Sequence, residues 1–316
     1  MSEQNVFYQV KYIKTKNKLR KIVTYKDELP DIKLKHEEIA AFINKNFIPS
    51  IFSKAYVKNR SIYHNAITHM YNDVFIALDI KNYFNSIDHK LLLSALYYEL
   101  NKRNKSTISK LECGKIISIC SIFKKGLPLG LVTSPILTNV YMKEFDNILY
   151  GKLKKMKLKD VMYTRYADDL VISFKRDVYL DSNQIRKNTD VIVHQVSSLL
   201  SRFKLKLNPA KTKITSFEKS NHVKITGVNI IRDSSNHRKL SIGRKIKNNL
   251  FHDAIKCFEE KNKNKSDVMK IKGLESFVLS IEKRGYEEIY SRNMKKKIKD
   301  LGFDSLHDLI NSLYYE

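Results

Sequence analysis

Two adjacent aspartates near the middle of the chain constrain its fold more than any other feature. Tyr166-Ala167-Asp168-Asp169 stands between two segments rich in β-branched and aromatic residues, 162–165 and 170–173. Such segments on both sides of a short polar turn predict a strand–turn–strand hairpin. The hairpin would present both carboxylates at its tip, within reach of a divalent metal ion. An isolated Asp-Asp pair is more often a solvated turn, so this reading needs support from the rest of the chain.

The chain is long enough for a large core and is strongly basic. Its 316 residues carry 59 Lys and Arg against 33 Asp and Glu, a net charge of +26 that is spread along the whole sequence. A folded surface with this charge attracts a polyanion, which favours nucleic acid as the partner. A Lys-rich protein from an AT-rich genome is the alternative explanation of the charge alone.

Cysteine usage and hydropathy indicate a cytoplasmic protein. The three cysteines are too few for a disulfide framework, and Cys113 and Cys120 have no nearby His with which to hold zinc. We expect them to be buried, reduced thiols. The N-terminus shows no apolar signal region, and no run reaches the ~18 apolar residues that span a bilayer. We therefore expect no membrane partner.

The periodicity of apolar residues predicts an α+β body followed by a helical C-terminal unit. Extended segments are expected at 7–24 (a hairpin), 74–79, 162–173, 211–217 and 223–231. Helices are expected at 33–47, 89–101, 108–122, 135–154 and 184–203, and the chain reads as mostly helical from 245 onward. Pro135 suits the first turn of its helix, where its missing N–H costs nothing.

Asp79, Asp168 and Asp169 form a candidate metal site. Nucleotidyl transfer uses two divalent cations, one beside the attacking 3′-hydroxyl and one beside the leaving pyrophosphate. Mg²⁺ prefers carboxylate oxygens together with substrate phosphate. Asp79 ends a buried strand and Asp168 lies at the hairpin tip, so neighbouring strands of one sheet would bring the two together. Taken alone, Asp79 is more simply explained as a helix N-cap or a turn residue.

From about residue 6 onward, the motifs in this order resemble those of a bacterial reverse transcriptase, and specifically of a retron reverse transcriptase. The general motifs are Tyr166-Ala167-Asp168-Asp169, Asp79-Ile80-Lys81-Asn82-Tyr83-Phe84, Gly126-Leu127-Pro128-Leu129-Gly130-Leu131-Val132-Thr133-Ser134-Pro135 with Asn139, Asn208-Pro209-Ala210-Lys211-Thr212, Leu240-Ser241-Ile242-Gly243-Arg244 and Leu19-Arg20-Lys21-Ile22. Two further motifs point to retron enzymes. Asn65-Ala66-Ile67-Thr68-His69 has the Asn-Ala-x-x-His form typical of them, and Ile225-Thr226-Gly227 stands where they usually carry Val-Thr-Gly, with Ile225 in place of Val. Leu129 departs from the pattern, because many relatives have Gln there.

The resemblance implies a right-hand polymerase fold, with fingers and palm in residues 1–240 and a helical, duplex-binding thumb in 241–316. It implies two Mg²⁺ ions, with Mn²⁺ as a substitute, held at Asp79, Ile80, Asp168 and Asp169. The residues implied to bind the nucleotide are Arg20 and Lys21 on the triphosphate, Phe84 against a ribose 2′-hydroxyl, Gly130 close to the base pair, and Lys211 as proton donor to pyrophosphate. The residues implied to bind nucleic acid are Asn65, His69, Thr133, Ser134, Thr226, Gly227, Gly243, Arg244 and Lys245, with Lys247 and Lys295, Lys296 and Lys297 on the thumb.

The implied function is RNA-directed DNA polymerisation from dNTPs. A retron enzyme copies a dedicated structured non-coding RNA, starts from a 2′-hydroxyl of that RNA, makes a branched RNA–DNA product and acts in antiphage defence with a separate effector protein. A non-retron defence or intron-type reverse transcriptase is one alternative. A catalytically inactive RNA-binding scaffold is another, and the intact Asp79, Asp168 and Asp169 argue against it. The sequence does not identify the RNA, the priming nucleotide, the effector, the phage trigger or the oligomeric state.

Overall fold

The chain folds into two compact units. The computed structural model describes residues 7–15, 18–102, 107–122, 124–177, 181–260 and 264–314. The first unit comprises residues 1–61 and 72–215, and the second comprises 62–71 and 216–316. The compact units therefore divide near residue 215, ahead of the predicted palm–thumb boundary at 240. Fingers, palm and thumb are functional parts of a polymerase, and their boundaries in this chain stay a prediction.

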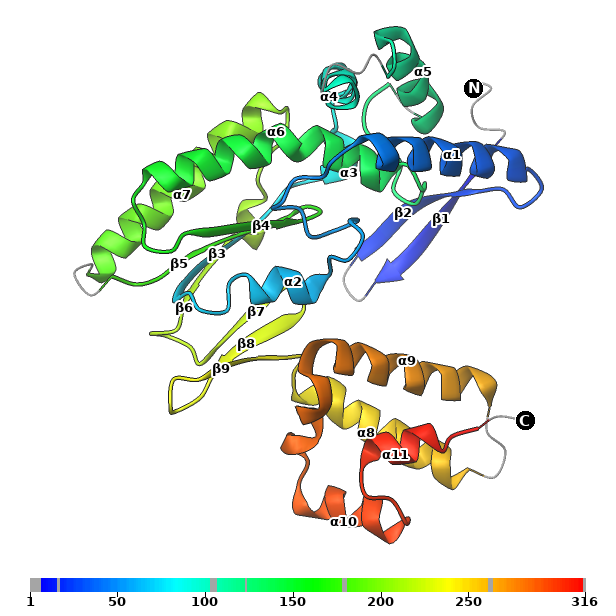
Figure 1. Ribbon diagram of the computed structural model, residues 1–316, viewed down its shortest axis with the longest axis vertical. Helices are drawn as coiled ribbons and strands as arrows, with labels where there is room; N and C mark the ends of the chain where they lie inside the picture. The colour runs from blue at the N-terminus through cyan, green and yellow to red at the C-terminus, as the bar shows by residue number, and fades with distance from the viewer. Residues whose placement is uncertain are drawn as a thin grey trace. The chain divides into compact units, whose positions relative to one another are not determined.

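The first unit holds a two-stranded hairpin, a four-stranded sheet and the helices around them (Figure 1). Its strands are β1 (Tyr8–Thr15), β2 (Lys18–Tyr25), β3 (Val74–Asp79), β4 (Met162–Tyr166), β5 (Asp169–Phe174) and β6 (Lys213–Ser216). Its helices are α1 (Pro30–Asn46), α3 (Tyr83–Ser86), α4 (His89–Asn101), α5 (Lys110–Cys120), α6 (Ser134–Lys155) and α7 (Ser182–Arg202), with a 3₁₀ turn η2 (Pro209–Lys211).

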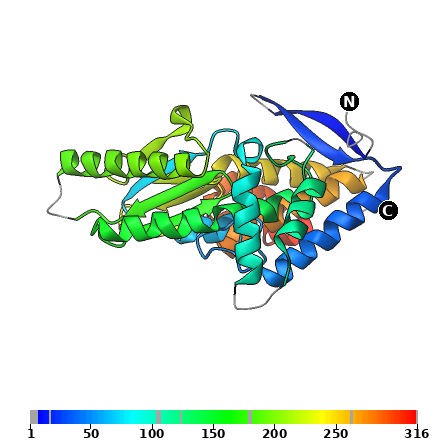
Figure 2. The same cartoon turned by 90° about the horizontal axis from the view of Figure 1, so that it is seen from above.

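The four-stranded sheet has the order β4-β5-β3-β6, and β5 pairs antiparallel with both β4 and β3. Helices α6 and α7 run alongside each other over this sheet (Figures 1 and 2). Their apolar side chains, among them Phe145 and Val196, join Ile76 and Ile172 of the central strands in one buried cluster. Because β3 and β5 are buried along nearly their whole length, polar side chains of these strands reach solvent only at the strand ends.

Local signals explain where the helices begin. The predicted helices are all present, and the largest shift is at α1, which starts at Pro30 instead of 33. Pro135 lies in the first turn of α6, as expected. Asp181 caps α7 through a capping box with Gln184, and Ser109 caps α5 in the same way. All three cysteines are buried free thiols, as the sequence predicts.

A buried polar network fixes β4 onto α6 beneath the Asp-Asp hairpin. Arg165 and Asp146 are both 0% exposed. Arg165 donates two parallel hydrogen bonds to Asp146, Nε to Oδ1 and a terminal nitrogen to Oδ2, each 2.9 Å long. Tyr163 donates to the same Oδ1 at 2.7 Å, and Arg165 also donates to Asn139 Oδ1 at 3.2 Å. Buried charges cost desolvation energy unless they are fully paired, and here the paired groups join β4, which leads into the hairpin turn, to α6.

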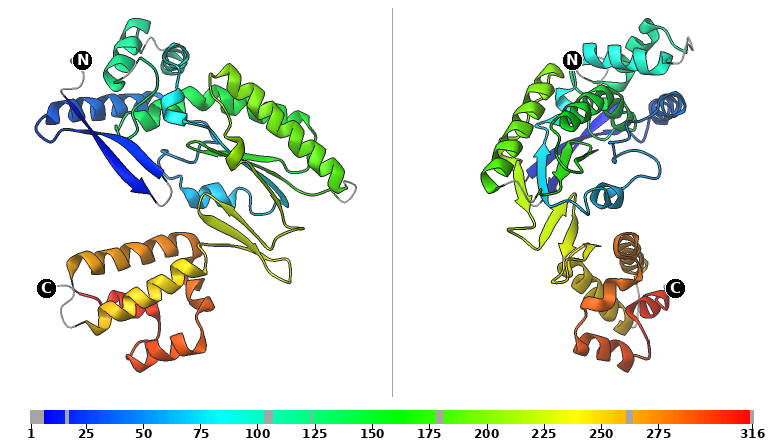
Figure 3. Two further views of the ribbon diagram at one scale, coloured as in Figure 1. Left: turned by 180° about the vertical axis from the view of Figure 1, so that it is seen from behind. Right: turned by 60° about the vertical axis from the view of Figure 1, so that its left-hand side comes forward.

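The second unit combines a short helix, a three-stranded sheet and a helical C-terminal part (Figures 1 and 3). Its elements are α2 (Ile62–Ile67), β7 (His222–Ile225), β8 (Val228–Arg232), β9 (Arg238–Ser241), α8 (Arg244–Glu259), α9 (Lys265–Glu282), the 3₁₀ segment η3 (Lys283–Ile289), α10 (Arg292–Asp300) and α11 (Leu306–Asn311). Helix α2 packs on β7 and β8. The helical character expected from residue 245 onward is confirmed.

One strand prediction is wrong. The segment 223–231 was expected to be a single strand, but β7 and β8 form a hairpin in which Ile225 pairs with Val228. Thr226 and Gly227 have φ values of 47° and 92°. Two consecutive residues with positive φ reverse the chain in a tight hairpin turn, and the Gly is the residue that signals it in the sequence.

Candidate active site

Three carboxylates meet at one end of the four-stranded sheet. Asp79, the last residue of β3, lies opposite Asp169, the first residue of β5, in antiparallel register. Asp168 lies in the turn between β4 and β5, and its carbonyl accepts a hydrogen bond of 3.0 Å from the N–H of Ile80. Ala167, also in this turn, has a φ of 55°, a strained value of the kind that clusters at functional sites. Backbone pairing thus brings the predicted carboxylates together.

Two residues that follow α7 hold the side chain of Asp79. The amide of Asn208 donates to Asp79 Oδ1 at 3.0 Å, and its backbone N–H donates to the Asp79 carbonyl at 2.8 Å. Lys211 Nζ lies 2.5 Å from the other oxygen, Oδ2, as an ion pair. Lys211 was predicted to belong to the site, whereas no role was predicted for Asn208. The position of Asn208, three residues before Lys211 in the same motif, was the sequence signal from which a role at the site could have been predicted.

The three carboxylates share one electrostatic environment. Burial raises the pKa of Asp168, the charge of Asp79 adds to the rise, and the charges of Lys211 and Arg20 oppose it. Burial raises the pKa of Asp169 to about 6, with further contributions from Asp168 and Asp79. The hydrogen bond to Asp79 raises the pKa of Lys211. The ionised carboxylates therefore repel one another in a partly desolvated place.

These residues fit divalent metal ions through the chemistry of their donors. Carboxylate oxygens at converging strand ends are the hard ligands that Mg²⁺ prefers. The side chain of Lys211 is 52% exposed, so this cation can leave Asp79 without unpacking the core. Within the described residues, no group of three His, Cys, Asp or Glu side chains is arranged so that it could hold a metal ion as the side chains stand, and both carboxylate oxygens of Asp79 are in contact with Asn208 and Lys211. Metal ligation by Asp79, Ile80, Asp168 and Asp169 stays a prediction.

The residues predicted to bind the nucleotide belong to the same unit. Arg20 and Lys21 are exposed on β2, and Arg20 is close enough to Asp168 to affect its pKa. Phe84 is partly buried on the core, with its ring in edge contact with Tyr83 at 5.3 Å and with Tyr56 at 6.5 Å between centroids. Burial raises the pKa of Tyr56 and the charge of Asp168 adds to the rise, so Tyr56 lies near the carboxylates although it was not predicted to. It is 48% exposed and has a φ of 59°, and no local pattern distinguishes it.

Gly130 has a structural reason to be glycine. Its φ is 115°, and a Cβ atom there would lie 2.3 Å from the carbonyl oxygen of Val23 and 2.7 Å from a methyl group of Ile22. The N–H of Val23 also donates to the carbonyl of Leu129 at 2.8 Å. The loop therefore packs directly on β2, and contact between Gly130 and a base pair stays a prediction. Leu129 takes part through its backbone, which a Gln would also supply.

Thr133 and Ser134 are less accessible than a nucleic-acid contact requires. Both are buried, and the hydroxyl of Ser134 donates to the carbonyl of Pro128 at 2.6 Å. Binding of nucleic acid by Thr133 and Ser134 therefore stays a prediction, with their side chains closed to solvent. Ser134 stabilises the loop that leads into α6, and any contact with template would come from other atoms of that loop.

The two retron-type motifs contact each other inside the second unit. Asn65 and His69 are fully buried, and the amide of Asn65 donates to the hydroxyl of Thr226 at 2.5 Å. The side chain of Asn65 thus supports the Thr226–Gly227 turn, and binding of RNA by Asn65 and His69 stays a prediction. Gly227 itself is exposed and stays a candidate contact.

The predicted thumb lysines divide into exposed and buried ones. Gly243, with a φ of 96°, joins β9 to α8, and the next residues, Arg244 and Lys245, are exposed. Lys247 contradicts the prediction, because its side chain is 3% exposed and pairs with Glu282. Lys295, Lys296 and Lys297 are exposed on α10, and Lys297 pairs with Glu259.

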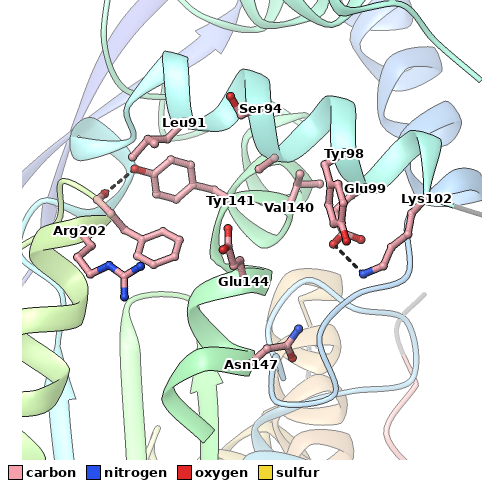
Figure 4. Close-up of a pocket in the computed structure, with 12 residues that line it drawn as sticks. Leu91, Ser94, Tyr98, Glu99, Lys102, Val140, Tyr141, Glu144, Asn147 and Arg202 are labelled. Atoms are coloured by element: carbon pink, nitrogen blue, oxygen red, sulfur yellow. Dashed lines mark hydrogen bonds and ion pairs between the residues drawn. The ribbon is translucent and has the colours of Figure 1, made fainter. Parts of the chain in front are cut away.

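A separate pocket of about 550 Å³ lies between α4, α6 and the end of α7 (Figure 4). Tyr141 crosses it and donates its hydroxyl hydrogen to the carbonyl of Phe203, while Lys102 pairs with Glu99 at its other side. None of the site residues predicted from the sequence lines this pocket, and we assign it no part in catalysis.

Comparison with known proteins defines the class. A family model described as reverse transcriptase (RNA-dependent DNA polymerase) matches residues 13–230. The match covers more than half of the chain, which therefore belongs to the reverse transcriptase family. The predicted activity, RNA-directed DNA polymerisation, is confirmed at this level.

No helix in the described ranges has both the length and the apolar composition that a bilayer crossing requires.

Curated relatives narrow the class to the retron type. The Retron Ec83 reverse transcriptase of Escherichia coli is 28% identical over 280 residues, which cover 86% of this chain and 83% of the relative. The Retron Ec73 reverse transcriptase of Escherichia coli is 27% identical over 252 residues, covering 78% and 77%. The chain is a retron-type reverse transcriptase, as its motifs indicate.

Solved structures support the fold. The apo telomerase from Candida tropicalis superimposes with a TM-score of 0.55 at 11% identity, over 98% of this chain and 64% of the telomerase chain. At this identity the likeness concerns the fold alone, and this chain spans just under two thirds of the telomerase. The predicted α+β right-hand polymerase fold is confirmed.

The raised pKa of Asp169 generates a prediction about stability. Its folded-state pKa of about 6 exceeds the ordinary value of 3.8 for an aspartate, so folding favours the protonated form. The stabilising contribution is present below about pH 4 and is lost as the pH rises through about 6. We expect Asp169→Asn to raise the melting temperature at pH 7.5 in EDTA, and the gain to vanish near pH 4.

Asp160→Asn is the control for this measurement. A hydrogen bond from Lys175 lowers the pKa of the exposed Asp160, so its loss should not stabilise the protein at neutral pH. A melting temperature of Asp169→Asn that equals or falls below that of wild type at pH 7.5 would contradict the proposed repulsion.

Proposed function

We propose that this chain copies a dedicated structured non-coding RNA into DNA that stays covalently joined to that RNA. Synthesis starts from a 2′-hydroxyl of the RNA, uses dNTPs, and takes place in the cytoplasm as part of an antiphage defence with a separate effector protein. The single observation that carries the polymerase chemistry is the register that puts Asp79 opposite Asp169, with Asp168 in the adjoining turn.

The chain's own residues act on the nucleotide in distinct ways. Arg20 and Lys21 bind the triphosphate, with Arg20 as the better bidentate donor. Asn208 keeps the Asp79 carboxylate oriented. Lys211 leaves Asp79 when the nucleotide binds and donates a proton to the pyrophosphate oxygen as the bond to it breaks. Exposure of half of the Lys211 side chain makes this movement inexpensive.

Asp79, Asp168 and Asp169, with the backbone at Ile80, would hold two Mg²⁺ ions. Bound there, the ions would activate the 3′-hydroxyl and neutralise the leaving pyrophosphate. Mn²⁺ would substitute, since it accepts the same oxygen ligands.

Charge and motif contacts support RNA as the template. A net charge of +26 supplies many phosphate contacts, and structured RNA is read largely through shape and 2′-hydroxyls. The contact between Asn65 and Thr226 joins the two motifs that set retron enzymes apart. We infer that the exposed turn which they support, together with Arg244 and Lys245, contributes to binding of the dedicated RNA.

Removal of one predicted metal ligand tests the proposed chemistry. Asp168→Asn keeps the shape of the side chain and removes its charge, so DNA synthesis with Mg²⁺ should fall by at least about 100-fold, as expected for loss of a preorganised charge. RNA binding, measured by filter retention, should stay unchanged. Asp160→Asn, an exposed aspartate of the same unit, is the matched control. Primer extension by Asp168→Asn at the control's rate would refute the site.

Phe84 provides a test of sugar selection. A rigid ring beneath the sugar leaves no room for a 2′-hydroxyl in a close-packed site. Phe84→Ala should therefore incorporate rNTPs while metal-dependent synthesis from dNTPs continues. Because Phe84 is only partly buried, its loss should cost less than the roughly 3–5 kcal/mol of a fully buried Phe.

Phe42→Ala serves as the control for stability, since Phe42 is a partly buried ring on the same core. If Phe84→Ala is folded and discriminates between dNTPs and rNTPs as wild type does, Phe84 has no part in sugar selection. Tyr83, the neighbouring aromatic residue, then becomes the next candidate.

A further inference from the structure

The β1–β2 hairpin carries Arg20 and Lys21 but belongs to no larger sheet. Among the described strands, β1 and β2 pair only with each other, whereas β3, β4, β5 and β6 form the four-stranded sheet (Figure 1). A hairpin of two strands is marginally stable without outside support. The direction of this hairpin is therefore set by its contacts with the rest of the first unit. Such contacts lie near its base, where Tyr8 pairs with Tyr25.

Two hydrogen bonds join β2 to the loop that precedes α6. The N–H of Val23 donates to the carbonyl of Leu129 at 2.8 Å. The N–H of Val132 donates to the hydroxyl oxygen of Tyr25 at 3.1 Å. Val23 and Leu131 are buried in one small apolar cluster, against which the ring of Tyr25 packs. The end of β2 is thus tied to the loop through its backbone and through one side chain.

A buried histidine holds the hydroxyl of Tyr25. His36 of α1 is 0% exposed, its Nε2 lies 3.2 Å from the carbonyl oxygen of Ile119, and its Nδ1 lies 3.0 Å from the hydroxyl of Tyr25. Because a carbonyl oxygen can only accept, Nε2 carries the hydrogen and Nδ1 of the neutral ring accepts from Tyr25. Burial lowers the pKa of His36, against the effect of its hydrogen bond to Ile119, so the ring is neutral at pH 7.5.

These contacts form one continuous hydrogen-bond chain. Val132 N–H donates to Tyr25, Tyr25 donates to His36, and His36 donates to the carbonyl of Ile119 in α5. Burial raises the pKa of Tyr25 to about 12, so its hydroxyl keeps the hydrogen that it donates. A buried network in which each donor has an acceptor favours one arrangement of its members. The chain therefore fixes β2, α1, α5 and the loop before α6 against one another.

The strand connects this fixed point to the proposed nucleotide site. Arg20 precedes Tyr25 by five residues on β2, which corresponds to about 17 Å in an extended strand. Arg20 is close enough to Asp168 to affect its pKa, so this part of the hairpin lies toward the carboxylates. A rotation of the strand by about 10° at Tyr25 would move Arg20 by about 3 Å over that length. A small loss of order at the base is thus enlarged at the arginine.

Tyr8 provides a matched comparison for Tyr25. The two are partners in the strand register, and the ring of Tyr8 also lies beside His36, at 6.2 Å between centroids. Its hydroxyl lies 3.3 Å from His36 Nε2 and 3.4 Å from the carbonyl oxygen of Ile119. Neither of these described partners belongs to the loop before α6. Tyr8 and Tyr25 therefore share residue type, register position and histidine, and differ in whether the hydroxyl binds the loop.

We propose that the hydroxyl of Tyr25 is a positioning group of DNA synthesis: by tying β2 to the loop before α6, it fixes where Arg20 and Lys21 meet the triphosphate of the incoming nucleotide. His36 keeps this hydroxyl in place. The proposal rests on the proposed function, in which Arg20 and Lys21 bind the triphosphate. Tyr25 acts on the nucleotide only through these two residues. Hydrogen bonds to phosphate tolerate a range of only about half an ångström, so a loosened strand should weaken nucleotide binding.

The first measurement compares Tyr25→Phe with Tyr8→Phe in the full chain. The substrate is a DNA primer annealed to an RNA template, with Mg²⁺ and a single dNTP at varied concentration. Tyr25→Phe keeps the ring and should raise the KM for dNTP about fivefold, as for loss of about one hydrogen bond. Its kcat should stay within about twofold, because binding lost equally from ground state and transition state changes KM alone. Tyr8→Phe should leave both constants within about twofold of wild type.

The second measurement shows whether the effect passes through the two cations. Arg20→Ala together with Lys21→Ala should lower kcat/KM for dNTP. Adding Tyr25→Phe to this double variant should change kcat/KM by less than about twofold, because residues that act as one unit are not additive. A structural role alone would lower kcat/KM to the same extent in both backgrounds.

His36→Gln keeps the test decisive if Tyr25→Phe does not fold. The glutamine amide can still donate to the carbonyl of Ile119, while the acceptor for Tyr25 is lost. We expect a rise of about threefold in the KM for dNTP, which disappears in the background without Arg20 and Lys21. An unchanged KM in a folded His36→Gln protein overturns the proposal.

The outcomes separate this inference from the proposed function. If Asp168→Asn abolishes synthesis while Tyr25→Phe matches Tyr8→Phe in KM, the polymerase assignment stands and the role of Tyr25 is overturned. The same holds if Tyr25→Phe has its full effect in the background without Arg20 and Lys21. If Asp168→Asn synthesises DNA as well as wild type does, the proposed function fails, and the role of Tyr25 fails with it.

Discussion

The mutual repulsion of three carboxylates is the physical constraint on which the rest of this structure depends. Asp79, Asp168 and Asp169 are held together by strand pairing in a place where water screens their charges poorly. Their arrangement is unfavourable for folding, and such groups are kept where they serve chemistry. The surrounding protein must therefore supply rigidity that withstands the repulsion and a positive charge that offsets it.

The rigidity and the positive charge both come from residues of the first unit. The bidentate pair of Arg165 and Asp146 fixes β4, the strand that leads into the Asp-Asp turn, onto α6. The positive charge comes from Lys211, whose ammonium lies against Asp79. The two pairs differ in burial: the first is closed to water, and the second is half-exposed on the lysine side. One is suited to a fixed scaffold, and the other to exchange of a protein cation for metal ions.

Sequence patterns predicted the features that arise from neighbours along the chain. The hairpin around Asp168 and the strand that ends in Asp79 follow from β-rich segments beside polar turns, and Pro135 marked the start of α6. The features that were missed depend on contacts between distant segments. Lys247 looks like any thumb lysine until Glu282 is seen beside it, and Asn65 looks like a surface residue until Thr226 covers it. Periodicity carries no information about such pairs, because each partner is ordinary in its own local sequence.

Diffraction at the manganese absorption edge, from crystals grown with a primer–template and a non-hydrolysable dNTP, tests the central claim most directly. The account predicts anomalous density bounded by carboxylate oxygens of Asp79 and Asp168, with Lys211 Nζ withdrawn from Asp79 and directed at the triphosphate. Manganese bound elsewhere, with the ion pair between Lys211 and Asp79 still intact beside an ordered nucleotide, would contradict it.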